Sequence, residues 1–169
     1  KPALFMVKFS RIRKRKNYEM NGEGQRMKQI SEDYRTGLEQ IDAEHLRLLD
    51  LTDQARKLFE DENMLFKCAD IRKILAGLQT YTAEHFAHEE AYMESIGYGG
   101  LELQKKQHRM FEQKLDEFTE RVSRLSLGTQ DDMIHDLFEY LQQWLHDHIK
   151  KEDMKYVDFG NGKTQEDRR

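Results

Sequence analysis

The chain has 169 residues, the length of one ordinary domain with or without a tail. Its composition, with 36% charged residues and a single proline at position 2, favours helices over a many-stranded sheet, and no apolar run approaches the roughly 18 residues that cross a bilayer. The net charge is −4, and the single cysteine, Cys68, excludes an internal disulfide and a zinc site built from several cysteines, which indicates a reducing, cytoplasmic compartment.

Residues 1–33 are predicted to form a basic N-terminal arm. Its first 16 positions carry seven Lys or Arg and no acid, so the remaining residues carry 21 basic and 32 acidic side chains, a balance of −11. An acidic body does not suit nucleic-acid binding, which depends on neutralising phosphates, and we expect no DNA or RNA partner. The arm either contacts an anionic surface or is a solvated tail.

Helical periodicity fills the middle of the chain and predicts four helices. They cover roughly residues 38–61, 67–96, 100–127 and 130–156. Short joins, such as the one at Gly128-Thr129, make sequential helices antiparallel neighbours. The sequence therefore predicts an all-α fold, an antiparallel up-down-up-down four-helix bundle over residues 34–157. Residues 158–169 lose the periodicity and are expected to be a C-terminal tail, or a linker to an output domain.

Each predicted helix carries one histidine on its apolar stripe. These four are His45, His85, His108 and His148, whereas His88, His135 and His146 fall off the stripes and are expected at the surface. A lone core histidine needs only a polar neighbour, but four on facing helices, with Glu89 on the same faces, call for a shared partner, because unpaired buried polar groups cost free energy. An imidazole and carboxylate set in a bundle core suits iron, manganese or zinc, and bridging carboxylates suggest two ions.

Four motifs occur in order along the predicted helices. They are Gly37-Leu-Glu-Gln-Ile-Asp-Ala-Glu-His45, Tyr81-Thr-Ala-Glu-His85-Phe-Ala-His-Glu89-Glu90-Ala-Tyr-Met93, Gly97-Tyr98 followed by His108, and Trp144-Leu-His-Asp-His148-Ile-Lys-Lys-Glu-Asp153. Together they resemble hemerythrin and the bacteriohemerythrins over about residues 34–157. The resemblance implies a four-helix bundle with a non-haem di-iron centre, two iron ions joined by an oxo or hydroxo bridge, that binds dioxygen reversibly or takes a small anion as its exogenous ligand.

The resemblance also implies a ligand set. His45 and His85 serve one iron, His108 and His148 serve the other, and Glu89 and Asp153 bridge the pair. Simple helical spacing conflicts with the last assignment, because five residues rotate Asp153 about 140° from His148, whereas Glu152 lies only about 40° away. We follow the resemblance, which requires a loosened helix end that turns Asp153 inward.

The third predicted helix departs from the family pattern. The family offers His-x-x-x-His there, and in this chain the first position is Gln104. An amide oxygen is a poorer donor to iron than an imidazole, so we expect one iron with an open position, filled by water or a small anion. The alternative is that Gln104 itself, or another side chain such as His88, completes the coordination.

Three functions follow, in order of preference. The first is an O₂ or redox sensor, since an open position favours exogenous ligands, in some bacterial relatives fused to an output domain such as a diguanylate cyclase. No catalytic residue is predicted in this domain, although a fused output domain could be an enzyme. The second is a stand-alone O₂ carrier or store. The third, a di-iron oxidase or peroxide-handling enzyme, is weakened because no stripe histidine has Glu three residues before it. A purely structural bundle is the remaining alternative.

Overall fold

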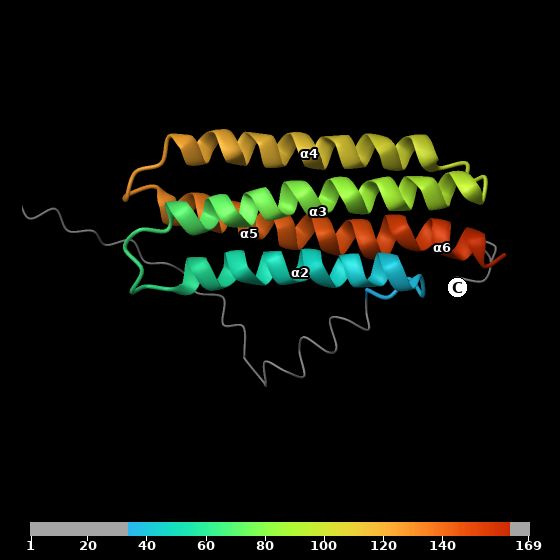
Figure 1. Cartoon of the computed structure of the whole chain (residues 1–169), viewed down its shortest axis with the longest axis horizontal. Helices are drawn as coiled ribbons and strands as arrows, with labels where there is room; N and C mark the ends of the chain where they lie inside the picture. The colour runs from blue at the N-terminus through green and yellow to red at the C-terminus, as the bar shows by residue number, and fades with distance from the viewer. Residues whose placement is uncertain (1–33, 163–169) are drawn as a thin grey trace, which may run out of the picture.

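A computed structural model describes residues 34–162, and the predicted basic arm lies outside the described residues (Figure 1). The helices are α2 (Glu39–Glu60), α3 (Cys68–Ser95), α4 (Leu101–Ser123), α5 (Gln130–Asp147), the π-helical segment η1 (His148–Asp153) and α6 (Met154–Gly160). This part of the chain contains no strand, and none of its helices combines the length and the apolar character needed to span a membrane. The prediction of an all-α four-helix bundle is confirmed.

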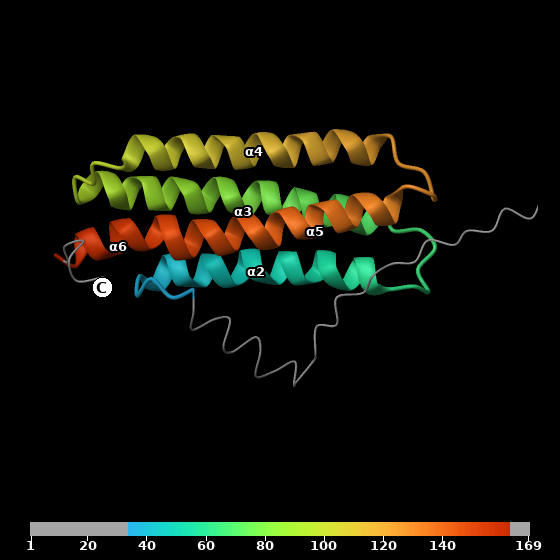
Figure 2. The same ribbon diagram turned by 180° about the vertical axis from the view of Figure 1, so that it is seen from behind.

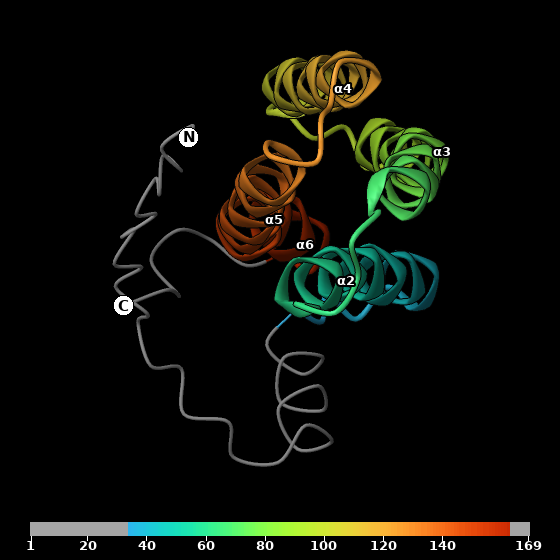
Figure 3. The same cartoon turned by 90° about the vertical axis from the view of Figure 1, so that its left-hand side faces the viewer.

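The four long helices alternate in direction and pack around a common axis. Viewed from one end, α2 lies against α3 and α5, and α4 lies against the same two helices on the other side (Figure 3). From behind, α5, η1 and α6 follow one another as a single rod (Figure 2). The α2–α3 and α4–α5 connections lie at one end of the bundle, whereas the α3–α4 connection, the start of α2 and the end of α6 lie at the other.

The core has two apolar parts with a polar layer between them. The larger cluster fills the middle and one end of the bundle and includes Leu48, Phe86 and Ile149. The smaller cluster, Met93, Tyr156 and Val157, lies at the end that holds the α3–α4 connection. Complete burial of one such side chain stabilises the fold by about 1.5–3 kcal/mol. Apolar packing on both sides therefore holds the polar layer that separates the clusters.

The helix ends differ from the predicted ones in two places. The third long helix ends at Ser123 rather than near 127, because the hydroxyls of Ser126 and Thr129 bond to each other and to the local backbone, which favours a turn over another helical turn. The last rod continues to Gly160, past the predicted end at 156, so the first residues of the predicted tail are helical. The first two predicted helices agree with α2 and α3 to within one residue at each end.

The start of α2 is fixed by a carboxylate from its own first turn. Asp42 Oδ1 accepts hydrogen bonds from the backbone nitrogen of Thr36 at 2.6 Å and from its hydroxyl at 2.8 Å, and Oδ2 accepts one from the nitrogen of Gly37 at 3.2 Å. Gly37 has φ +82°, a left-handed conformation that glycine adopts without strain. Asp42 thus holds the chain entry in place, one turn before the first histidine of the polar layer.

Candidate metal centre

All six residues of the predicted ligand set meet in the polar layer between the two clusters. His45 comes from α2, His85 and Glu89 from α3, His108 from α4, and His148 and Asp153 from the two ends of η1. None is more than 4% exposed. The structure therefore brings together all six side chains of that set, and their service as ligands remains our prediction.

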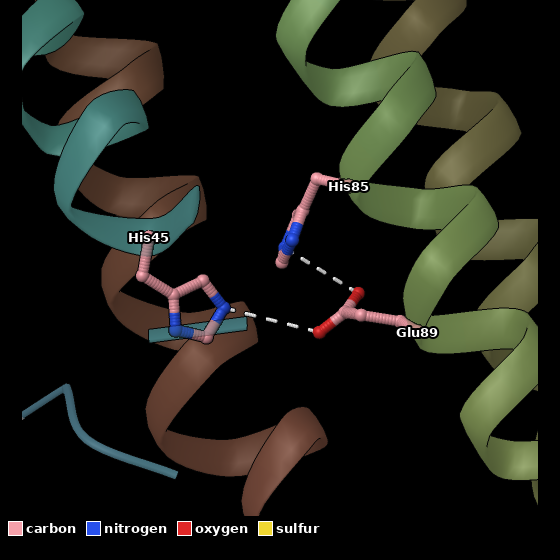
Figure 4. A group of neighbouring side chains, drawn as sticks. All are labelled: His45, His85 and Glu89. Atoms are coloured by element: carbon pink, nitrogen blue, oxygen red, sulfur yellow. Dashed lines mark ion pairs between the residues drawn. The ribbon is translucent and has the colours of Figure 1, made fainter. Parts of the chain in front are cut away.

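One half of the layer consists of two histidines that face one carboxylate. His45 Nε2 lies 3.8 Å from Glu89 Oε1, and His85 Nε2 lies 3.5 Å from Glu89 Oε2. Figure 4 shows both rings pointing at the Glu89 carboxylate, that of His45 from the neighbouring helix α2 and that of His85 from one turn earlier on α3, the helix that carries Glu89. His45 Nε2 also lies 3.5 Å from Asp153 Oδ2. Two imidazole nitrogens and three oxygens of two carboxylates thus converge in this half.

The other half repeats this arrangement with the remaining two histidines. His108 Nε2 lies 3.3 Å from Glu89 Oε2, and His148 Nε2 lies 3.2 Å from Asp153 Oδ1. The two Nε2 atoms are only 3.1 Å apart. Glu89 and Asp153 each contact histidines of both halves, which is the arrangement that a bridging carboxylate requires.

The outward nitrogen of three imidazoles has a partner that fixes the ring. His85 Nδ1 donates to Glu44 Oε2 at 3.0 Å, and His108 Nδ1 donates to Glu90 Oε1 at 2.8 Å. His45 Nδ1 donates to the carbonyl oxygen of Tyr34 at 3.3 Å. With the proton on Nδ1, the lone pair of Nε2 points into the layer, where a metal ligand needs it. Sequence reasoning missed Glu44 and Glu90, although each directly neighbours a predicted ligand in the motifs.

The π-helical segment explains how Asp153 reaches the layer. In a π-helix the backbone repeats at i→i+5 instead of i→i+4, so residues five apart come onto one face. Asp153 is fully buried beside His148, whereas Glu152 is only half-buried and bonds to Lys155 at 2.7 Å. The structure thus places Asp153 in the layer and leaves Glu152 outside it, whereas a regular α-helix would have turned Glu152 inward.

Three aromatic side chains complete the walls of the layer. Tyr156, fully buried, donates its hydroxyl proton to Glu89 Oε1 at 2.7 Å. Burial and the nearby Glu89 and Asp153 carboxylates raise the pKa of Tyr156, so the hydroxyl stays protonated and remains a donor. Phe86 stacks on His108 at 3.9 Å between ring centroids, and Trp144 stacks on His148 at 4.1 Å. Sequence reasoning gave these three no role, although Tyr156 lies one turn beyond Asp153.

The buried carboxylates make the layer a strongly negative environment. Burial alone would raise the pKa of Glu89, but the surrounding imidazoles of His85, His108 and His45 hold it well below its ordinary value. Burial alone would likewise lower the pKa of His45, yet the Asp153 and Glu89 carboxylates raise it to about 10. The two carboxylates thus demand compensating positive charge inside the bundle, from protons or from cations.

The donor atoms that face inward fit a pair of metal ions. His45 Nε2, Glu89 Oε2 and Asp153 Oδ2 are buried and lack hydrogen-bond partners among the described residues, at a cost of about 1–3 kcal/mol for each such group. Two groups of three residues offer ligand atoms that lie within 4.8 Å of one another inside each group. One group is His45, His85 and Glu89. The other is Glu89, His108 and His148, so the two groups share Glu89. Cations would satisfy these atoms together, and imidazole with carboxylate suits iron.

Of the other polar residues considered from the sequence, one lies in the layer and the remaining histidines lie outside it. Gln104 is 2% exposed and donates from Nε2 to Asp153 Oδ1 at 3.3 Å, so it belongs to the layer. The three remaining histidines do not. His88 is exposed and bonds to Glu44, His146 is exposed and bonds to Tyr34, and half-buried His135 contacts Glu139. His88 is therefore a poor candidate for a missing ligand.

Comparison with known proteins agrees with this geometry. The family model of the hemerythrin HHE cation binding domain matches residues 36–159. A bacteriohemerythrin of Clostridium acetobutylicum is 29% identical over 127 residues, which cover 75% of this chain and 96% of the relative. A bacteriohemerythrin of Pseudomonas paraeruginosa is 32% identical over 127 residues, 75% of this chain and 77% of the relative. A hemerythrin from Sipunculus nudus is 37% identical over 109 residues, 63% of this chain and 79% of the relative. The resemblance inferred from the motifs is confirmed.

Proposed function

The chain belongs to the hemerythrin family, with its di-iron site, and we propose that it binds dioxygen reversibly at this centre as an O₂ carrier or store. The observation that carries the proposal is the pair of overlapping buried groups that share Glu89. A reversible two-electron carrier needs two metals close together, and one shared carboxylate keeps them so. When bound, a pair of ferrous ions supplies the two electrons that reversible O₂ binding requires.

In this proposal the chain's own residues have separate tasks. His45 and His85 hold one iron, and His108 and His148 hold the other. Glu89 and Asp153 join the two. Glu44 and Glu90 keep the imidazole protons on the outward nitrogens, which leaves Nε2 free for the metal. The tight packing of Phe86 and Trp144 against two of the rings excludes water, which limits loss of electrons to solvent-borne oxidants.

Sensing of O₂ or redox state is the second candidate, and Gln104 is the observation that favours it. If Gln104 leaves one iron open, the centre oxidises readily and reports O₂ instead of storing it. The comparisons support the carrier or store more strongly. The match covers 96% of the length of the Clostridium bacteriohemerythrin, so that relative has little room for a further domain. The order of preference reached from the sequence is therefore reversed.

The two candidates differ in how the loaded protein behaves over repeated cycles. The apoprotein would be loaded anaerobically with Fe(II), exposed to O₂ and then purged with argon, while the visible spectrum is recorded. A carrier or store returns to its starting spectrum over many cycles, whereas a sensor with an open site is oxidised in the first few. His135→Gln, a change at a histidine outside the layer, provides the control and should cycle like the wild type.

A further inference from the structure

Gln104 is a buried amide with one end paired and the other end free. Its Nε2 donates to Asp153 Oδ1 at 3.3 Å. A carboxylate oxygen only accepts hydrogen bonds, so this contact fixes which end of the amide faces Asp153. The other end, Oε1, is buried and has no hydrogen-bond partner among residues 34–162. A buried carbonyl oxygen without a partner is costly and needs an explanation.

The contacts place Gln104 in one half of the layer. Asp153 presents Oδ1 to both Gln104 and His148, and it presents Oδ2 to His45 on the opposite side. Gln104 also precedes His108 by four residues on α4, which puts the two side chains on the same helix face, one turn apart. Gln104 is therefore a neighbour of the His108 and His148 pair.

We propose that Gln104 is a metal ligand whose Oε1 binds the cation held by His108 and His148. The inference rests on the proposed di-iron centre and adds one donor to it. Side-chain amide oxygens are hard, neutral ligands that bind divalent cations. The hydrogen bond from Nε2 to Asp153 holds the amide so that its oxygen is the free atom. The position that the sequence leaves open is thus filled by the chain itself.

A consequence is that the two metal positions are chemically different. The His45 and His85 position has two imidazoles and the shared carboxylates. The His108 and His148 position has the same set and an amide oxygen besides. Two positions with different donor sets bind one kind of ion with two distinct affinities, and removal of Gln104 changes only one of them. A residue that merely positions Asp153 would act on both, because Asp153 contacts both halves.

The first test is an anaerobic titration of the 169-residue apoprotein with Fe(II), followed by calorimetry. In Gln104→Leu we expect one of the two affinities to fall at least about tenfold while the other stays as in the wild type. Gln107→Leu is the matched control, since Gln107 is on the same helix and also leaves its Oε1 unpaired, but is only half-buried and lies off the apolar stripe. It should leave both affinities unchanged. Gln104→Glu keeps an oxygen donor and should keep both ions.

The second test observes the Gln104 amide directly in the wild-type protein, and a variant serves only to assign its band. The infrared spectrum of protein with ¹³C-labelled glutamine side chains is compared before and after loading with Mn(II). The carbonyl band of Gln104, identified by its loss in Gln104→Glu, should move to lower wavenumber on loading, because metal binding weakens the C=O bond. A band that does not move, or equal weakening of both affinities in Gln104→Leu, overturns the inference.

Failure of the inference is distinct from failure of the proposed centre. Wild-type protein that takes up fewer than two ions contradicts the di-iron proposal itself. Wild-type protein that takes up two ions, while Gln104→Leu keeps both affinities and the carbonyl band stays in place, contradicts only the role of Gln104.

Discussion

His148 Nε2 and Asp153 Oδ1 lie 3.2 Å apart although five residues separate them in the chain. The segment between them is π-helical, and the residues on both sides are α-helical. A single π-turn acts as one inserted residue in an α-helix and is common at functional sites. This local distortion allows one rod of the bundle to supply both a histidine and a carboxylate to the same buried layer.

Deletion of Lys151 should remove the distortion and keep the centre. Without this exposed residue, Asp153 follows His148 by four positions, which is one α-helical turn. The same face of α6 then stays turned toward the core. We expect the deletion variant to bind two metals per chain, measured by elemental analysis after reconstitution. A variant with one alanine inserted after Lys151 is the control and should lose metal. Metal loss in the deletion variant would contradict the role given to the π-turn.

Asp153 and Glu152 should differ sharply on substitution. Asp153→Asn removes a carboxylate that contacts both halves of the layer, and we expect it to lower iron content by more than half. Glu152→Gln breaks only a half-exposed pair with Lys155, which is worth at most about 1 kcal/mol. Iron content and thermal stability of that variant should match the wild type. Equal iron loss in both variants would refute the choice between the two carboxylates.

Much of this layer could be predicted from the sequence, because helix period is a strong signal. The spacing of His45, His85 and His108 on apolar stripes was enough to place them on one layer. The spacing of His148 and Asp153 was not, since regular helix geometry points to Glu152, and only the resemblance selected the carboxylate that the structure buries in the layer. Helix period carries no information on where a π-turn interrupts it.

The outward partners of the histidines could not be predicted for a different reason. Glu44 joins His85 across two helices, and such a contact depends on the relative rotation of α2 and α3. Tyr156 likewise reaches Glu89 from the helix beyond the π-turn. A stripe pattern identifies which face of a helix is buried, but it does not determine which side chains of two faces touch. That information belongs to the packed structure.

Glu90 should matter for metal affinity although it is not a proposed ligand. Its carboxylate holds the Nδ1 proton of His108 at 2.8 Å and thereby orients Nε2. Loss of such outer partners typically costs about 10–100-fold in metal affinity. Glu90→Gln keeps a weaker acceptor, so we expect its loss of metal affinity to lie near the low end of that range. The loss in Glu90→Leu should lie near the high end. Competition with a chelator measures both. An exposed acid on the same helix, Glu94, provides the control through Glu94→Gln.

Removal of metal should lower the melting temperature without unfolding the bundle. An ion that binds only the folded state adds about 4 kcal/mol of stability at a thousandfold excess over Kd. The apolar clusters on both sides of the layer contain most of the core and do not depend on the ions. Circular dichroism should show a helical apoprotein with a melting temperature several degrees below that of the loaded protein. An unchanged melting temperature would mean that no metal binds in the layer.

The central claim, that two irons share Glu89 in a single buried layer, is tested most directly by iron content together with magnetic coupling. We predict two irons per chain in the reconstituted, oxidised wild type, with a diamagnetic ground state because the irons are coupled, measured by Mössbauer spectroscopy in a field. Glu89→Gln should lose most of its iron, since the shared carboxylate serves both ions. Two uncoupled irons in the wild type, or full iron content with unchanged coupling in Glu89→Gln, would contradict the account.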